Sequence, residues 1–132
     1  LDDALVLDNG SPHFVTIVDD LQNLDVKEEG EKIRNSKPFK KEGINVNFVL
    51  DNANLQVRTY ERGVEDETLS CGTGVVATAI AIHYANFTKE NQLNINTKGG
   101  KLSVSFEEFN GVYRNIWLSG DVNMVYAGEF EC

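Results

Sequence analysis

The sequence is poor in cysteine and in basic residues, and it has no long apolar run. Its two cysteines, Cys71 and Cys132, are too few for the disulfide framework of a small secreted domain. Its 12 basic residues face 21 acidic ones, for a net charge of −9, so the basic surface that binds nucleic acid or an anionic membrane is lacking. No apolar segment approaches the roughly 20 residues that span a bilayer. We expect no nucleic-acid or membrane partner, and a reducing, cytoplasmic setting.

Metal-binding spacings and processing signals are missing as well. His13, His83 and the two cysteines are too scattered to suggest a metal site, so no metal is expected. The chain opens on Leu1 with neither an initiator methionine nor a signal-peptide pattern, and we expect it to be a piece of a longer protein. What is present is ordinary: 41% hydrophobic and 25% charged residues in 132 predict a single globular domain, residues 1–132, with one core.

Most of the chain alternates between apolar and polar residues with the period of a β-strand. Gly99-Gly100 lies between two such runs and is a hairpin signal. The predicted strands are 13–18, 46–50, 55–60, 93–95, 102–106, 112–118 and 122–127.

Two segments have the signals of helices. Residues 25–35 begin with Asp25 and Glu28 at the spacing of a capping box and carry a thin apolar stripe, which predicts a surface helix. Residues 72–86 are apolar on nearly every side, so that helix must be buried, and in a small domain the sheet must cover it. The sequence therefore predicts an α+β fold, a curved and mostly antiparallel sheet wrapped around one central helix.

Cys71 stands at the predicted start of the buried helix, where free N–H groups and the helix dipole favour an anion. Gly72 and Gly74 leave the backbone open to a ligand, and Thr73 adds a hydroxyl. One turn can thus hold a carboxylate beside a reactive thiol. A packed core thiol is the competing interpretation of the same residues.

Four further residues are candidates for the same chemistry. Arg62 offers a planar fork to a carboxylate and Glu61 can receive an ammonium group, although neighbouring strand residues point to opposite faces and exposed edge charges are the alternative. His13 is either a proton-relay or thiol-tuning group or a structural histidine. Asn45 either offers its amide to a ligand or serves a turn. His83, on the apolar helix, is expected to be structural.

The order of these motifs is more specific than any one of them. Residues 10–13 read Gly-Ser-Pro-His, Asn45 follows, residues 60–63 read Tyr-Glu-Arg-Gly, and residues 71–74 read Cys-Gly-Thr-Gly. Over nearly its whole length the chain resembles the second half of the diaminopimelate epimerase family. One departure is Ser11, which stands where that family commonly has asparagine and carries a shorter polar group.

The resemblance implies two similar halves, each a sheet curled around a helix, with the active site between them. It implies the interconversion of LL- and meso-diaminopimelate without a cofactor, a step toward lysine and peptidoglycan. Cys71 would be one of two acid/base thiols, and His13 would lie near the reacting carbon. The implied substrate contacts are Ser11, Asn45, Glu61, Arg62, Gly72 and Thr73.

This chain holds one suitable thiol, and in the family the other lies in an N-terminal half that is absent here. We therefore expect the chain to fold without epimerising, to need that half as a partner, and to expose an apolar seam through which it forms homodimers. A proline or hydroxyproline racemase-like enzyme shares the Cys-Gly-Thr-Gly helix start and is the nearest alternative. A phenazine-biosynthesis-type isomerase would not need the thiol. A non-catalytic amino-acid-binding module on the same scaffold is the alternative from another class.

Overall fold

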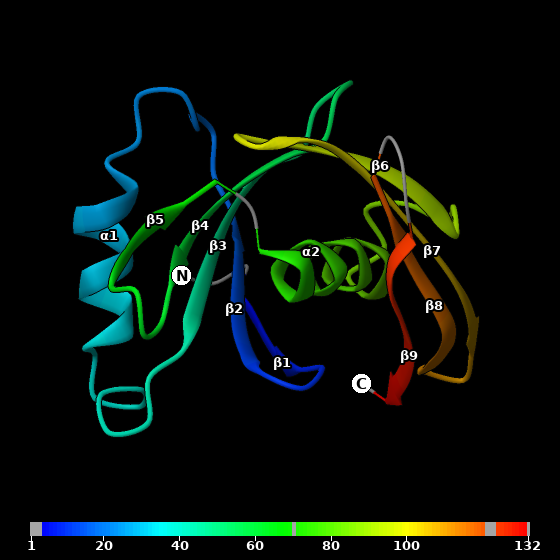
Figure 1. Ribbon diagram of the computed structural model, residues 1–132, viewed down its shortest axis with the longest axis horizontal. Coiled ribbons are helices and arrows are strands. Elements are labelled where there is room, and N and C mark those ends of the chain that lie inside the picture. Colours follow the sequence, from blue (N-terminus) through cyan, green and yellow to red (C-terminus); the bar gives the residue numbers. More distant parts are fainter. Residues whose placement is uncertain (1–3, 70, 121–123, 132) are drawn as a thin grey trace.

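One sheet curls around a central helix in the computed structural model, which describes residues 4–69, 71–120 and 124–131, the last range by its backbone alone (Figure 1). The helices are α1 (Val26–Arg34) and α2 (Gly72–Tyr84). The strands are β1 (Leu5–Asp8), β2 (Pro12–Ile17), β3 (Asn45–Leu50), β4 (Gln56–Glu61), β5 (Asp66–Thr68), β6 (Gln92–Thr97), β7 (Gly100–Phe109), β8 (Val112–Ser119) and β9 (Met124–Glu131).

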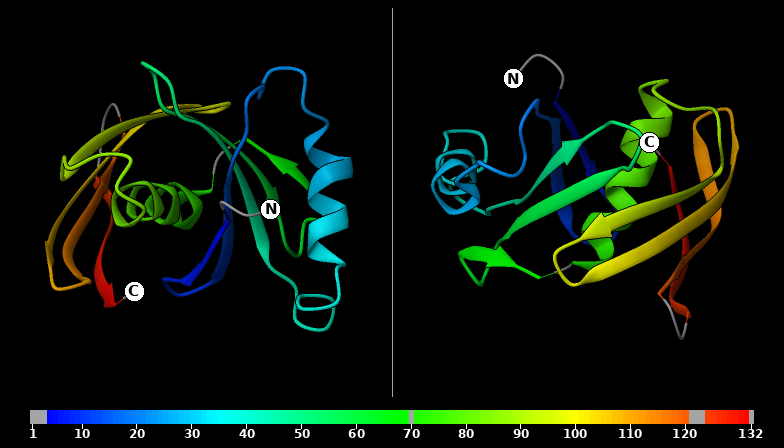
Figure 2. Two further views of the ribbon diagram at one scale, coloured as in Figure 1. Left: turned by 180° about the vertical axis from the view of Figure 1, so that it is seen from behind. Right: turned by 90° about the horizontal axis from the view of Figure 1, so that it is seen from above.

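The strands form one sheet in the order β1-β2-β3-β4-β6-β7-β8-β9, and β5 pairs with β4 beside this path. The β2–β3 and β4–β6 contacts are parallel and all the other pairings are antiparallel. Between β4 and β6 the chain first forms β5, which pairs with β4, and then leaves the sheet to form α2. The sheet curls so far that α2 contacts both of its halves, from β1 and β2 to β7 and β8 (Figure 2). The predicted α+β fold class, a curved sheet around one buried helix, is confirmed.

The core lies between α2 and the inner face of the sheet. Every residue from Gly74 to Ile82 is buried, as expected for a helix that is apolar all round. Side chains from both halves of the sheet close over it. These are Leu7, Val15, Val49, Val57, Ile95, Val104, Phe106, Ile116 and Leu118. A fully buried Val, Leu or Ile contributes about 1.5–3 kcal/mol, so this packing fixes the position of both ends of α2.

Helix α1 lies on the outer face of the sheet, against β3, β4 and β5 (Figure 1). Asp25 caps it, since its Oδ1 accepts a hydrogen bond from Glu28 N–H at 3.0 Å. Gly30 packs directly on the Tyr60 ring, where a Cβ would overlap the ring atoms. The predicted surface helix is confirmed, and Gly30 explains how a helix with so thin an apolar stripe approaches the sheet closely.

Local details differ from the sequence prediction. The hairpin link is Lys98-Gly99, one residue earlier than expected, because Gly100 already pairs with Thr97. Helix α2 ends at Tyr84, two residues earlier than expected. Strands β1 and β5 were not predicted. The start of the strand predicted at 122–127, and Cys132, lie outside the described residues.

His83 is structural, as expected: its Nδ1 is 2.7 Å from the Tyr113 hydroxyl. Within the described ranges, no helix is long and apolar enough to cross a membrane.

Candidate active site

Cys71 is the N-cap residue of α2, with extended backbone angles of φ −130° and ψ 111°. Its side chain makes no capping hydrogen bond, and the thiol is free and half-buried. The first intrahelical bond runs from Val75 N–H to the Cys71 carbonyl at 2.9 Å. The N–H groups of Gly72, Thr73 and Gly74 therefore have no acceptor inside the helix. Because Gly72 is exposed, this helix start is accessible to a ligand.

Thr73 joins the thiol to the loop between β1 and β2. Its Oγ1 lies 3.5 Å from Cys71 Sγ, 3.0 Å from His13 Nε2 and 3.3 Å from Ser11 Oγ. The Asn9 side chain donates from Nδ2 to the Thr73 carbonyl at 2.8 Å. One hydroxyl thus connects three of the residues that the sequence singled out.

His13 is fully buried at the start of β2. Burial lowers its pKa from 6.5 to about 4, an effect that Asp8 opposes and Arg62 reinforces. The imidazole is therefore neutral near pH 7. A neutral imidazole has one N–H donor and one bare nitrogen acceptor, so its neighbours decide which nitrogen faces Thr73.

Asn47 lies behind His13 on the inner face of the sheet and is fully buried. Its Nδ2 is 3.0 Å from His13 Nδ1 and 3.2 Å from the Phe14 carbonyl. Its Oδ1 accepts from the Thr59 hydroxyl at 2.9 Å. Gly74 packs against this amide, because a Cβ there would come within 2.5 Å of Oδ1.

Asn45 ties β2 to the end of β4. Its Nδ2 donates to the Pro12 carbonyl at 3.1 Å, and its Oδ1 accepts from Arg62 N–H at 2.8 Å. The Arg62 guanidinium donates from Nη1 to the Glu42 carbonyl at 3.0 Å. Glu61 Oε1 accepts a long hydrogen bond of 3.4 Å from the Thr68 hydroxyl. Both side chains are half-buried, and their role toward a ligand stays a prediction.

The structure gathers five of the predicted site residues at the start of α2. These are Ser11, His13, Cys71, Gly72 and Thr73. Asn45, Glu61 and Arg62 form a second group at the end of β4. Sequence reasoning missed Asn9 and Asn47. Asn47 had one signal, since it follows Asn45 at the two-residue spacing of a single strand face.

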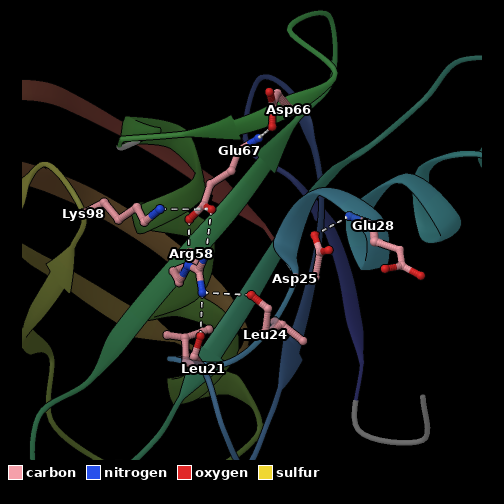
Figure 3. A network of polar contacts seen from close by, with 8 residues as sticks. All are labelled: Leu21, Leu24, Asp25, Glu28, Arg58, Asp66, Glu67 and Lys98. Atoms are coloured by element: carbon pink, nitrogen blue, oxygen red, sulfur yellow. Dashed lines mark hydrogen bonds and ion pairs between the residues drawn. The ribbon is translucent and has the colours of Figure 1, made fainter.

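An ion-pair network secures the segment that leads to Cys71 (Figure 3). Arg58 on β4 binds Glu67 on β5 through two hydrogen bonds of 2.7 Å and donates to the carbonyls of Leu21 and Leu24. Lys98 reaches the same carboxylate at 3.2 Å. Burial alone would raise the pKa of Glu67, but the bonds from Arg58 and Lys98 lower it.

Beyond β5, Gly99 N–H donates to the Leu69 carbonyl at 2.9 Å. The network and this bond together hold the approach to the helix start against the sheet. Among the described side chains, His, Cys, Asp and Glu form no cluster of three or more that could hold a metal ion.

Solved structures share this curled sheet around a helix. A PhzF-family phenazine biosynthesis protein from Bacillus anthracis aligns with a TM-score of 0.60 at 22% identity, over 87% of this chain and 37% of its own. A predicted epimerase from Pseudomonas aeruginosa aligns at 0.56 and 12% identity, over 83% and 38%. At these identities the likeness shows the fold alone, which is that of the PhzF-type and epimerase proteins.

Sequence comparison narrows this class to one family. The model of the diaminopimelate epimerase family matches residues 5–125. A diaminopimelate epimerase from Flavobacterium psychrophilum is 50% identical over 127 residues, covering 95% of this chain and 50% of that protein. The enzyme of that name from Methanocella arvoryzae is 43% identical over 98% of this chain and 44% of its own length. The chain belongs to the diaminopimelate epimerase family, and it spans about half the length of the curated relatives it matches.

Proposed function

We propose that the chain is the C-terminal half of a cofactor-independent diaminopimelate epimerase, in which Cys71 is one of two acid/base thiols. The observation that carries the proposal is the position of the thiol. Cys71 Sγ is half-buried at the start of a buried helix, it is not used to cap that helix, and a hydroxyl lies 3.5 Å away. A merely structural cysteine needs none of these features. The relatives at up to 50% identity carry the name of this activity, which supports it here.

The proposed reaction moves one proton on and one proton off a single carbon. A thiolate on one face takes the α-proton, the C–H electron pair passes toward the carboxylate, and a thiol on the other face donates a proton to the same carbon. Cys71 serves as one of these groups and changes between thiol and thiolate in each turnover. The opposed thiol belongs to the half that this chain lacks.

The start of α2 would bind the carboxylate next to the reacting carbon. Negative charge grows on that carboxylate as the proton leaves, and N–H groups already aimed at it stabilise the charge without rearranging. The N–H groups of Gly72 and Thr73 have no partner within the helix and lie beside Cys71. The same turn thus supplies the acid/base group and the donors.

The distal end of diaminopimelate carries a second ammonium and a second carboxylate. We propose that Arg62 binds the carboxylate while Glu61 and Asn45 hold the ammonium group. Asn45 Oδ1 already accepts a hydrogen bond from the Arg62 N–H at 2.8 Å. It therefore also fixes the backbone position from which the Arg62 side chain extends. Ser11 contributes at most a short hydroxyl, which is shared with Thr73 at 3.3 Å.

The test uses the longer parent protein in deuterated water, with diaminopimelate as substrate and proline as the alternative. Deuterium at the α-carbon of diaminopimelate alone, lost in Cys71→Ala, supports the proposal. Thr78→Val is the matched control on α2, since Thr78 is fully buried one turn beyond Gly74, and it should retain exchange. Exchange into proline would move the assignment to a racemase, and no exchange from a folded parent would favour a binding module.

The isolated chain provides a second test. With a single suitable thiol it should fold but leave both substrates undeuterated. Turnover by the purified chain that is lost in Cys71→Ala would refute the two-half scheme, whereas turnover unchanged in that variant would come from a contaminating enzyme.

A further inference from the structure

We propose that Asn47 is a positioning residue that sets the direction of a hydrogen-bond chain ending on Cys71. The chain runs from Asn47 through His13 and Thr73 to the sulfur. The inference rests on the proposed acid/base role of Cys71 and adds the residue that orients the groups behind it. The groups around the Asn47 amide fix which of its atoms donates a hydrogen bond and which accepts one.

The orientation of the Asn47 amide is fixed on both sides. Its Nδ2 lies 3.2 Å from the Phe14 carbonyl, which can only accept a hydrogen bond. On the other side, Oδ1 accepts from the Thr59 hydroxyl at 2.9 Å. A flipped amide would set two oxygens against each other at Phe14. The nitrogen must therefore also face His13 Nδ1, at 3.0 Å.

This orientation determines the tautomer of His13. Because Asn47 Nδ2 donates, His13 Nδ1 must be the bare acceptor, and the proton of the neutral ring is on Nε2. The Nε2–H group then donates to Thr73 Oγ1 at 3.0 Å. The Thr73 hydroxyl oxygen thus accepts the hydrogen bond from His13. Its own O–H group can therefore donate to a different acceptor.

The two remaining neighbours of Thr73 Oγ1 are Cys71 Sγ at 3.5 Å and Ser11 Oγ at 3.3 Å. When Cys71 is a thiolate it is the stronger acceptor, so the hydroxyl proton turns toward sulfur. With the opposite tautomer, Thr73 would have to donate to His13 instead. The thiolate would then lose that donor, which is why the direction of the chain matters.

Gly74 makes this arrangement possible. A Cβ at this position would lie 2.5 Å from Asn47 Oδ1 and 3.4 Å from Cys71 Sγ. The buried amide therefore occupies the space that any other residue at position 74 would fill. A competing view is that Asn47 merely holds β2, β3 and β4 together. The protonation pattern of His13 distinguishes the two views, since a purely structural role makes no demand on it.

The first measurement is ¹⁵N NMR of the two histidine side chains in the full 132-residue chain. At neutral pH, His13 should carry its proton on Nε2 and have a bare Nδ1. In Asn47→Asp a carboxylate replaces the donor, so Nδ1 should carry a proton. Thr59→Val is the matched control: it removes a buried hydroxyl from the same amide but leaves the Nδ2 donor, and Nδ1 should stay bare. A wild-type His13 protonated on Nδ1 overturns the proposal even if no variant folds.

The second measurement is the alkylation rate of Cys71 as a function of pH, in a Cys132→Ser background so that one thiol reports. Asn47→Leu removes the donor without adding a charge to those of Asp8 and Arg62, which act on His13. Its alkylation at neutral pH should fall about tenfold, the size expected for losing a hydrogen bond to a charged group. An unchanged rate in a variant shown to be folded by circular dichroism overturns the proposal. Neither measurement uses diaminopimelate, so they can fail while the proposed activity stands, or succeed if it falls.

Discussion

The buried imidazole of His13 makes the free energy of unfolding depend on pH. It does so over a pH range that lies above the range in which the carboxylates titrate. Its pKa is 6.5 without the fold and about 4 within it. As the pH falls below 6.5, His13 becomes protonated in the unfolded chain, whereas in the folded chain it stays neutral down to about pH 4. The stabilising contribution is therefore complete above pH 6.5 and is lost as the pH falls toward 4. At about 1.4 kcal/mol per pH unit, the loss amounts to about 2.5 kcal/mol between pH 7.5 and 4.5.

The assay is urea unfolding across this range, followed by the fluorescence of the single tryptophan, Trp117. His13→Gln removes the titration but keeps a side-chain amide near Thr73. Subtracting its free energy of unfolding from that of the wild type cancels the carboxylates, such as Glu67, whose lowered pKa acts at lower pH. The difference should fall by about 2.5 kcal/mol from pH 7.5 to 4.5. A difference that stays constant across the range would refute a buried, neutral His13.

Three further substitutions test the packing around the site by urea unfolding. Gly74→Ala should cost about 1–3 kcal/mol because its Cβ would meet Asn47 Oδ1 at 2.5 Å, and an unchanged midpoint would contradict that contact. Thr78→Val should leave the free energy of unfolding unchanged or raise it by about 1 kcal/mol, because Thr78 Oγ1 is buried and has no partner among the described residues. A clear decrease in the free energy of unfolding would mean that the hydroxyl is hydrogen-bonded. Arg58→Met should lower the free energy of unfolding by about 2–4 kcal/mol. The substitution leaves the Glu67 carboxylate, only 13% exposed, with Lys98 as its one remaining ion-pair partner among the described residues. A loss below about 0.5 kcal/mol would show that solvent weakens the Arg58–Glu67 ion pair.

The sequence predicted the elements that local pattern controls. Helix α2 was predicted because a run of apolar residues with no polar face can only be buried, and α1 because Asp25 and Glu28 mark its start. Strand β5 was missed because Asp66, Glu67 and Thr68 show no apolar alternation. It is held by the pair with Arg58 on β4, a contact that depends on the tertiary fold.

The site was only partly predictable for a related reason. In an ordinary strand an asparagine between apolar residues points to solvent. Strand β3 is instead covered by α1 on one face and α2 on the other, so Asn45 and Asn47 are both buried. Their roles follow from partners on β2 and β4, and the pairing order of the sheet cannot be read from local pattern. The thiol and its helix start were found because glycines beside a cysteine are visible in the sequence itself.

The N-terminal residues of the two helices differ in whether their side chains cap the helix. Comparing them shows how much helix stability is lost by placing Cys71 at the start of α2. At α1 the side chain of Asp25 bonds a backbone N–H of the first turn, and such a cap stabilises a helix by about 1 kcal/mol. At α2 the equivalent residue is Cys71, whose side chain makes no such bond. The chain therefore forgoes that stabilisation at its most buried helix while using it at an exposed one. Helix stability alone would favour the opposite assignment. An uncapped start beside a thiol and an exposed glycine leaves N–H groups for an external anion, which is the arrangement that the proposed proton abstraction next to a carboxylate would use.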